Sequence, residues 1–141
     1  MSLSVDSKAN ATLAFFVKSI DYPEEVPVGA TSFTLQVDGA EIVATAAGGA
    51  LRLVCRLTDD AAELPRLAEY AAGRMLREDA ALACDGNGAF LWQETAAAAD
   101  AHALRRTFET FADSCDWWRA RLEERPADAE APSFPEMMIR P

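Results

Sequence analysis

Residues 33–57 read FTLQVDGAEIVATAAGGALRLVCRL, and this stretch decides the fold. Its first five residues alternate apolar and polar side chains, which is the period-two pattern of a strand with one buried face. Asp38-Gly39 follows and supplies a tight hairpin turn, whose two central residues must both take positive φ. A return strand over Ala40–Ala46 completes the pattern. The sequence therefore predicts a β-hairpin at this point.

A third strand is predicted after a second turn at Gly48-Gly49. Its apolar residues recur at every second position and therefore share one face: Leu51, Leu53, Cys55 and Leu57. Three strands that follow one another through short turns form an antiparallel meander.

A helix is expected on the N-terminal side of this meander, over about Asp6–Ile20. Its apolar residues recur at steps of three and four, which places them on one face: Ala9, Leu13, Phe16, Val17 and Ile20. Phe15 falls off this stripe, so it is either simply exposed or part of a second contact surface. Pro23 and Pro27 end the helix, and Tyr22–Thr31 is predicted to be a loop.

A second helix is predicted after the meander, ending at about Glu78. Its start is ambiguous, because Asp60 with Glu63 resembles a capping box whereas Pro65 favours the first helical position. Three small residues in its middle, Ala71-Ala72-Gly73, permit close approach of another helix or sheet, including a second copy of the chain.

Two more strands and a long helix follow. The strands Ala80–Cys84 and Ala89–Gln93 flank the turn Asp85-Gly86-Asn87-Gly88, whose glycines and asparagine suit left-handed backbone positions. The last helix is predicted over Ala99–Glu124, and its apolar stripe steps regularly by four and three residues: Leu104, Phe108, Phe111, Cys115, Trp118 and Leu122.

These elements predict an α+β protein with a single antiparallel, twisted sheet of about five strands and three helices, in the order α-β-β-β-α-β-β-α. One domain is expected over residues 1–125, followed by a proline-rich tail over residues 126–141. Two interpretations of the tail stay open. It is an extended segment without a partner, or its apolar cluster Phe134–Ile139 docks on the protein's own groove or on a dimer mate.

The composition favours a soluble, cytoplasmic protein. A net charge of −10 over 141 residues repels nucleic acid and anionic lipid, so neither is expected as a partner. The same charge can steer a basic partner segment, although many soluble proteins are equally acidic. No apolar stretch approaches the ~20 residues of a membrane span, and the start of the chain does not resemble a signal peptide. The cysteines lack CxxC spacing and are expected to be buried apolar residues: Cys55, Cys84 and Cys115.

No catalytic residue, metal site or cofactor is predicted. The turn at 85–88 lacks the lysine and the following helix of a phosphate-binding loop. A single histidine, His102, without a nearby cysteine cannot form an ordinary zinc site. Ser114 and Cys115 lack the sequence context of an activated nucleophile. We therefore expect that the protein is not an enzyme.

The element order, the acidity and several local sequences resemble the class I type III secretion chaperones, the Tir-chaperone or CesT-like family. The resemblance covers about Asp6 to Arg125. It is carried by FTLQVDG at 33–39, LRLVC at 51–55, a helix that opens with Leu64-Pro65 and closes with MLRED at 75–79, and GAFLW at 88–92. The family closes that helix with a Leu-Leu-x-Ala-Asn-like sequence, from which Met75 and Asp79 depart.

The resemblance implies a homodimer that binds the N-terminal segment of an effector in an extended form and keeps it soluble and competent for secretion, without ATP or metal. By matching position it implies these partner-binding residues: Phe15, Phe16, Phe33, Leu35 and Val37. For the dimer contact it implies another set: Leu67, Ala71, Met75 and Leu82. The alternative for each partner-binding residue is that it fills the core.

Two other functions stay open at the level of sequence. A protein of the same fold can be a regulator that sequesters another protein of the secretion system. A small enzyme or ligand-binding domain would need a deep pocket with at least two converging polar groups.

Overall fold

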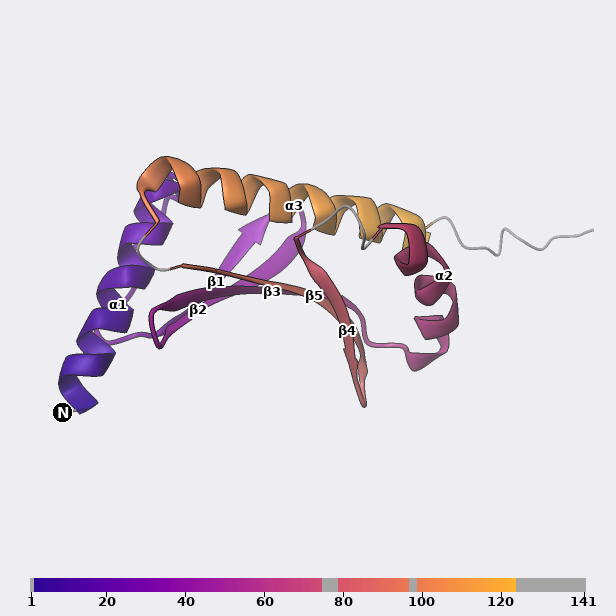
Figure 1. Ribbon diagram of the computed structural model, residues 1–141, viewed down its shortest axis with the longest axis horizontal. Helices are drawn as coiled ribbons and strands as arrows, with labels where there is room; N and C mark the ends of the chain where they lie inside the picture. The colour runs from indigo at the N-terminus through magenta and orange to yellow at the C-terminus, as the bar shows by residue number, and fades with distance from the viewer. Residues whose placement is uncertain (1, 75–78, 97–98, 124–141) are drawn as a thin grey trace, which may run out of the picture.

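The computed structural model describes residues 2–74, 79–96 and 99–123, and these form three α-helices and one five-stranded antiparallel sheet (Figure 1). The elements are α1 (Ser2–Ser19), β1 (Ser32–Val37), β2 (Ala40–Ala47), β3 (Ala50–Thr58), the 3-10 turn η1 (Ala61–Glu63), α2 (Leu64–Arg74), β4 (Ala81–Asp85), β5 (Gly88–Ala96) and α3 (Ala101–Glu123). The predicted α+β class and element order are confirmed. The predicted tail lies outside the described residues.

The sheet has the strand order β1-β2-β3-β5-β4, so β1 and β4 are its two edges. One row of paired residues crosses all five strands: Leu35, Ile42, Cys55, Leu91 and Leu82. Side chains in register on neighbouring strands point to the same face of a sheet. The first four of these are buried, because α3 spans this face and α1 packs against its β1–β2 end (Figure 1). We call it the core face, and the opposite one the open face.

The last strand is longer than its sequence pattern predicts. β5 continues beyond Gln93 to Ala96, because Thr95 and Ala96 pair with Leu51 and Ala50 at the start of β3. A long neighbouring strand supplies backbone partners that the local sequence does not reveal.

The core is the layer between the sheet and the two long helices. The predicted α3 stripe is confirmed, since Leu104, Phe111 and Trp118 are at most 1% exposed. The α1 stripe meets it through Phe16 and Phe108, whose rings pack edge to face with centroids 5.8 Å apart. Burial of large apolar side chains, about 1.5–3 kcal/mol each, is the main stabilising contribution here.

The helix starts differ in part from the predicted ones. α1 begins four residues before Asp6, since a helix can extend beyond its apolar stripe when each added residue gains a backbone hydrogen bond. The predicted start of α2 is ambiguous because both sequence signals, the cap at Asp60 and the proline at 65, are used by consecutive elements. The Asp60 carboxylate caps η1 by accepting from Ala62 N at 2.9 Å, and Pro65 lies in the first turn of α2. The predicted end of α2 at Glu78 falls outside the described residues.

Side chains of α2 attach it to the end of α3: Tyr70 and Arg74 pack on Trp117, and Arg66 caps the last turn. The Arg66 guanidinium donates to the carbonyl oxygens of Arg121, at 3.1 and 3.2 Å, and of Leu122, at 2.9 Å. These carbonyls lie in the last turn of α3, where a helix leaves acceptors unpaired and its dipole favours a cation. α2 therefore packs at the C-terminal end of α3, beyond the β4 side of the sheet (Figure 1).

Candidate protein-binding surfaces

The five predicted partner-binding residues divide between the core and the surface. Phe16 and Leu35 are completely buried in the core, so in this structure a partner has no access to their side chains. Phe33 and Val37 lie half-buried on the core face of the edge strand β1. Phe15 is 46% exposed on α1 and is one of the two large exposed apolar residues among those described.

The loop between α1 and β1 runs beside this edge and is held in place by side chains. The Asn10 amide donates to the carbonyl oxygens of Pro27, at 2.9 Å, and Ala30, at 2.7 Å. The Tyr22 ring packs edge to face on Phe33, with centroids 5.9 Å apart. Tyr22, which lies in the predicted loop, thus contacts a predicted partner-binding residue.

A hollow of about 380 Å³ lies between α1 and this loop, and we call it the α1–loop groove. Its walls come from two short segments: Ala14, Val17, Lys18, Tyr22, Pro23, Glu24, Glu25 and Val26. Val17 is buried, Tyr22 and Val26 are half-buried, and both glutamates are exposed. The groove therefore has an apolar floor and a charged rim.

The outer edge of β1 carries backbone groups that no strand pairs with, since β1 pairs with β2 alone among the described strands. The Thr31 carbonyl accepts from Ala46 N of β2, whereas the Gln36 N–H points outward and donates to the Tyr22 hydroxyl at 3.0 Å. Bonding directions alternate along a strand, so the backbone of Thr34 also faces outward. This edge can accept a further strand.

The predicted dimer residues are only partly on the surface. Leu67 is 1% exposed and belongs to the core, while Ala71 and Leu82 are half-buried. Met75 lies outside the described residues. A small apolar groove of about 220 Å³ separates α2 from β4: Leu64, Ala68, Leu82, Ala83, Cys84 and Ala89. Cys84 is exposed there, which corrects the expectation that every cysteine is buried, because its side chain falls on an edge strand.

The open face carries an aromatic cluster that the candidate residues drawn from the sequence do not include. Phe90 and Trp92 stand on β5 beside Val54 of β3, and together with three charged residues they line a hollow of about 460 Å³: Arg52, Arg56 and Asp85. We call Val54, Phe90 and Trp92 the open-face patch. Their alternation with buried Leu91 and Gln93 in a strand is the signal that reveals them.

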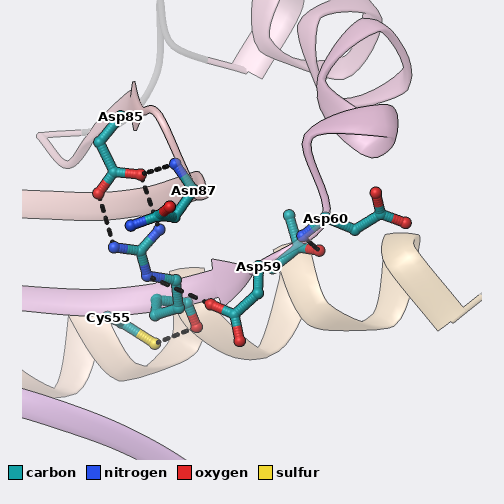
Figure 2. Close-up of polar contacts among 7 residues, drawn as sticks. Cys55, Asp59, Asp60, Asp85 and Asn87 are labelled. Carbon is teal, nitrogen blue, oxygen red and sulfur yellow. Dashed lines mark hydrogen bonds and ion pairs between the residues drawn. The ribbon is translucent and has the colours of Figure 1, made fainter.

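Arginine–carboxylate pairs border this patch. Arg52 stacks 5.5 Å from the Trp92 ring and pairs with Glu94 at 2.6 Å. Arg56 stacks 5.6 Å from the Phe90 ring and pairs with Asp85 at 2.7 Å, as Figure 2 shows for the second pair. The Arg56 guanidinium, together with the Asn87 N–H, lowers the pKa of Asp85 to about 2.

The residues weighed for catalysis do not converge. Ser114 and Cys115 are buried in α3, whereas His102 is exposed in its first turn. A hydrogen bond with Cys55 and burial raise the pKa of the Cys115 thiol far above its ordinary value, so it stays protonated at neutral pH. Among the described residues, no group of three His, Cys, Asp or Glu lies close enough together to hold a metal ion.

One polar hollow, of about 390 Å³, lies at the start of α3, where Asp100, His102 and Arg106 face Asp79 and Gln93. It is open at the surface rather than deep. Within the part of the chain that the structure describes, no helix has the length and apolar character to cross a membrane.

Comparison with known proteins relates this architecture to a group of solved complexes. Family models and curated protein sequences give no match. Among solved structures, a chain of the HopA1–SchA chaperone–effector complex has a TM-score of 0.63 at 15% identity, over 82% of this chain and 95% of that chain. A chain of the ExsC–ExsE complex gives 0.62 at 17% identity, over 82% and 94%.

The structure of the Yersinia pestis type III secretion chaperone SycH with a fragment of YscM2 gives a TM-score of 0.56 at 13% identity, over 78% of this chain and 98% of that chain. Identities at this level establish the architecture rather than the activity. The element order, the sheet topology and these alignments together show that the chain has the fold of the class I type III secretion chaperones.

Proposed function

We propose that this protein is a type III secretion chaperone of the bacterial cytoplasm, which binds the N-terminal segment of an effector in an extended form and keeps it soluble and competent for secretion. The observation that carries the proposal is the unpaired outer edge of β1, a strand that also holds half-buried Phe33. Solved complexes of the same fold contain chaperone–effector pairs.

An extended segment can bind such an edge in a simple way. Its backbone pairs with the outward groups of β1 near Thr34, which supplies affinity without regard to sequence. Alternate side chains of the added strand then lie toward Phe33, and this apolar contact supplies selectivity. Phe15, exposed on α1, is proposed as a separate apolar contact for the segment. A segment held in this way cannot pair with other chains, which keeps it soluble.

The proposed chaperone is a homodimer. The predicted contacts Ala71 and Leu82 lie on the α2–β4 side of the molecule, and the open-face patch extends toward the same edge because Trp92 pairs with Ala81 of β4. The rim of the patch is close to neutral, because Arg52 pairs with Glu94 and Arg56 pairs with Asp85 and, at 3.8 Å, with Asp59, whereas the whole chain has a net charge of −10. A two-fold related copy can therefore meet it without the repulsion found elsewhere, with each arginine near a carboxylate of its mate.

The proposed function does not include catalysis. This is supported by the separation of exposed His102 from buried Ser114 and Cys115, together with the open, shallow form of the polar hollow at the start of α3. The proposed role needs neither cofactor nor metal.

Co-expression with candidate effectors tests the function. Full-length chain carrying an affinity tag is expected to retain the first ~100 residues of one secreted protein in soluble form, and the same fragment alone is expected to aggregate. The retained segment should stay sensitive to limited proteolysis at its unbound ends. Failure to retain any secreted protein's N-terminal segment would refute the chaperone, and retention of a folded regulatory protein instead would favour the sequestering regulator.

A further inference from the structure

The α1–loop groove has a chemical character that the chaperone role does not by itself require. Its floor is apolar, formed by buried Val17 with half-buried Tyr22 and Val26. Its rim carries two adjacent carboxylates, Glu24 and Glu25, both exposed.

The charges at this rim are unbalanced. Within the described residues neither Glu24 nor Glu25 takes part in an ion pair, whereas the preceding acid, Asp21, is already paired with Arg105. Among the described residues that line the groove, Lys18 is the only cation, so the lining has two carboxylates and one ammonium group. The net charge of −10 on the whole chain adds to the negative potential at the groove.

The loop is also fixed before any partner arrives. Asn10 anchors it at Pro27 and Ala30, and Tyr22 anchors it at Gln36 of β1. A groove with an ordered wall loses little entropy when it is filled. It also lies directly beside the free edge of β1, because Tyr22 lines the groove and contacts Phe33 at the same time.

We propose that the α1–loop groove selects a lysine or arginine in the bound segment, next to the residues that pair with β1. This inference rests on the proposed function and names the chemistry of its partner. The aliphatic stem of such a side chain lies on Val17 and Val26, and its charged head reaches the rim at Glu24 and Glu25. A purely apolar side chain leaves both carboxylates without a partner, and an acidic one is repelled.

The test uses the full-length protein and three synthetic probes. Each probe is a nine-residue glycine–serine peptide with a central Val-X-Val, where X is lysine, Nε-acetyl-lysine or glutamate. Acetyl-lysine keeps the stem and removes the charge, so the first two probes isolate the electrostatic contribution. Binding is followed by NMR, which also locates the site through the amide signals of Tyr22, Glu24 and Val26.

The lysine probe is expected to shift these amides and to bind about 3–10-fold more tightly than the acetyl-lysine probe, the range typical of exposed charge pairs acting in concert. The double variant Glu24→Gln, Glu25→Gln should abolish that difference. Its matched control, Glu69→Gln with Glu123→Gln, changes the net charge equally at exposed sites on α2 and α3 and should preserve it.

Three outcomes overturn the inference: equal binding of the lysine and acetyl-lysine probes, shifts confined to another surface, or an equal loss in the control variant. The chaperone role is judged separately. If the wild type and the Glu24→Gln, Glu25→Gln variant retain an effector segment equally well, the function stands and the groove preference falls. If the wild type retains no segment, the function falls, and the probe titration still decides what the groove prefers.

Discussion

The Tyr22 hydroxyl accepts a hydrogen bond of 3.0 Å from the outward-facing backbone N–H of Gln36, so a side chain from the preceding loop occupies one position of the open edge of β1. The same ring packs on Phe33. The free part of the edge therefore begins at Thr34, one bonding position away. An incoming segment either stops at Thr34 or replaces the hydroxyl at Gln36.

Tyr22→Phe separates the two roles of this residue. The ring contact with Phe33 remains, and the Gln36 N–H loses its acceptor. The free energy of unfolding should fall by only about 0.5–1 kcal/mol, since the bond is exposed to water. Amide hydrogen exchange at Gln36 should become faster by NMR. Tyr70→Phe is the control, and unchanged exchange at Gln36 in Tyr22→Phe would show that the hydroxyl does not protect this edge.

The proposed effector-binding residues and the proposed dimer surface at the open-face patch should respond independently to mutation. Phe15→Ser removes an exposed aromatic from α1 and should weaken effector binding about ten-fold while the mass in solution stays that of a dimer. Trp92→Ser removes the largest member of the open-face patch and should yield monomers by light scattering. The assignment of the surfaces is wrong if Phe15→Ser dissociates the protein or if Trp92→Ser leaves it dimeric.

Gly88 is required by a close backbone crossing. It has φ of 148°, and a Cβ at this position would lie 2.0 Å from the Thr58 carbonyl oxygen. Gly88→Ala should lower the free energy of unfolding by about 2–4 kcal/mol, because backbone strain and overpacking add. Gly86→Ala, in the same turn with nothing within 4 Å of the new Cβ, should cost much less. Chemical denaturation compares the two, and equal losses would contradict this account.

Arg66 should be needed to keep α2 packed against α3. Arg66→Ala removes the donors to the Arg121 and Leu122 carbonyls and the ion pair with Glu63. Charge-assisted hydrogen bonds of this kind are worth about 1–3 kcal/mol, so thermal unfolding should shift down accordingly. Arg106→Ala, an exposed arginine of α3, should change stability by less than about 0.5 kcal/mol. A similar loss of stability in both variants would show that Arg66 has no specific role in attaching α2.

The Asp85–Arg56 pair predicts a pH dependence at the open face. The hydrogen bond from Arg56 lowers the Asp85 pKa from 3.8 to about 2, so the folded state favours the ionised carboxyl. Its stabilising contribution is complete above about pH 4 and is lost as pH falls toward 2. In Arg56→Gln the Asp85 pKa, followed by carbonyl NMR shifts, should rise toward 3.8 but stay below it, because Asn87 N–H still donates. Arg52→Gln should leave it near 2, and a wild-type value near 3.8 would refute the pairing.

Periodicity was sufficient to predict much of the core. The alternation in residues 33–57 and the regular stripe of α3 place large apolar side chains on one side of each element. Burying that side away from water is favourable, so it faces the core. Periodicity did not predict the burial of Gln93. This polar residue ends the predicted strand, but in the structure β5 continues to Ala96 and Gln93 is buried. Strand length depends on the partner strand, which the local sequence does not contain.

What the sequence by itself determined is the order of elements, the inward face of each and the acidity of the whole. Only the tertiary structure decided which inward-facing residues stay accessible. Phe16 and Leu35 are completely buried, while Phe33, two residues before Leu35 on the same strand, remains half-buried at the edge of the sheet. The tertiary structure also decided that Tyr22, Glu24 and Glu25 line one groove with α1, and that Phe90 and Trp92 share a sheet face that lines a hollow. Periodicity reports which side of an element turns inward, but exposure depends on what the rest of the chain lays over that side.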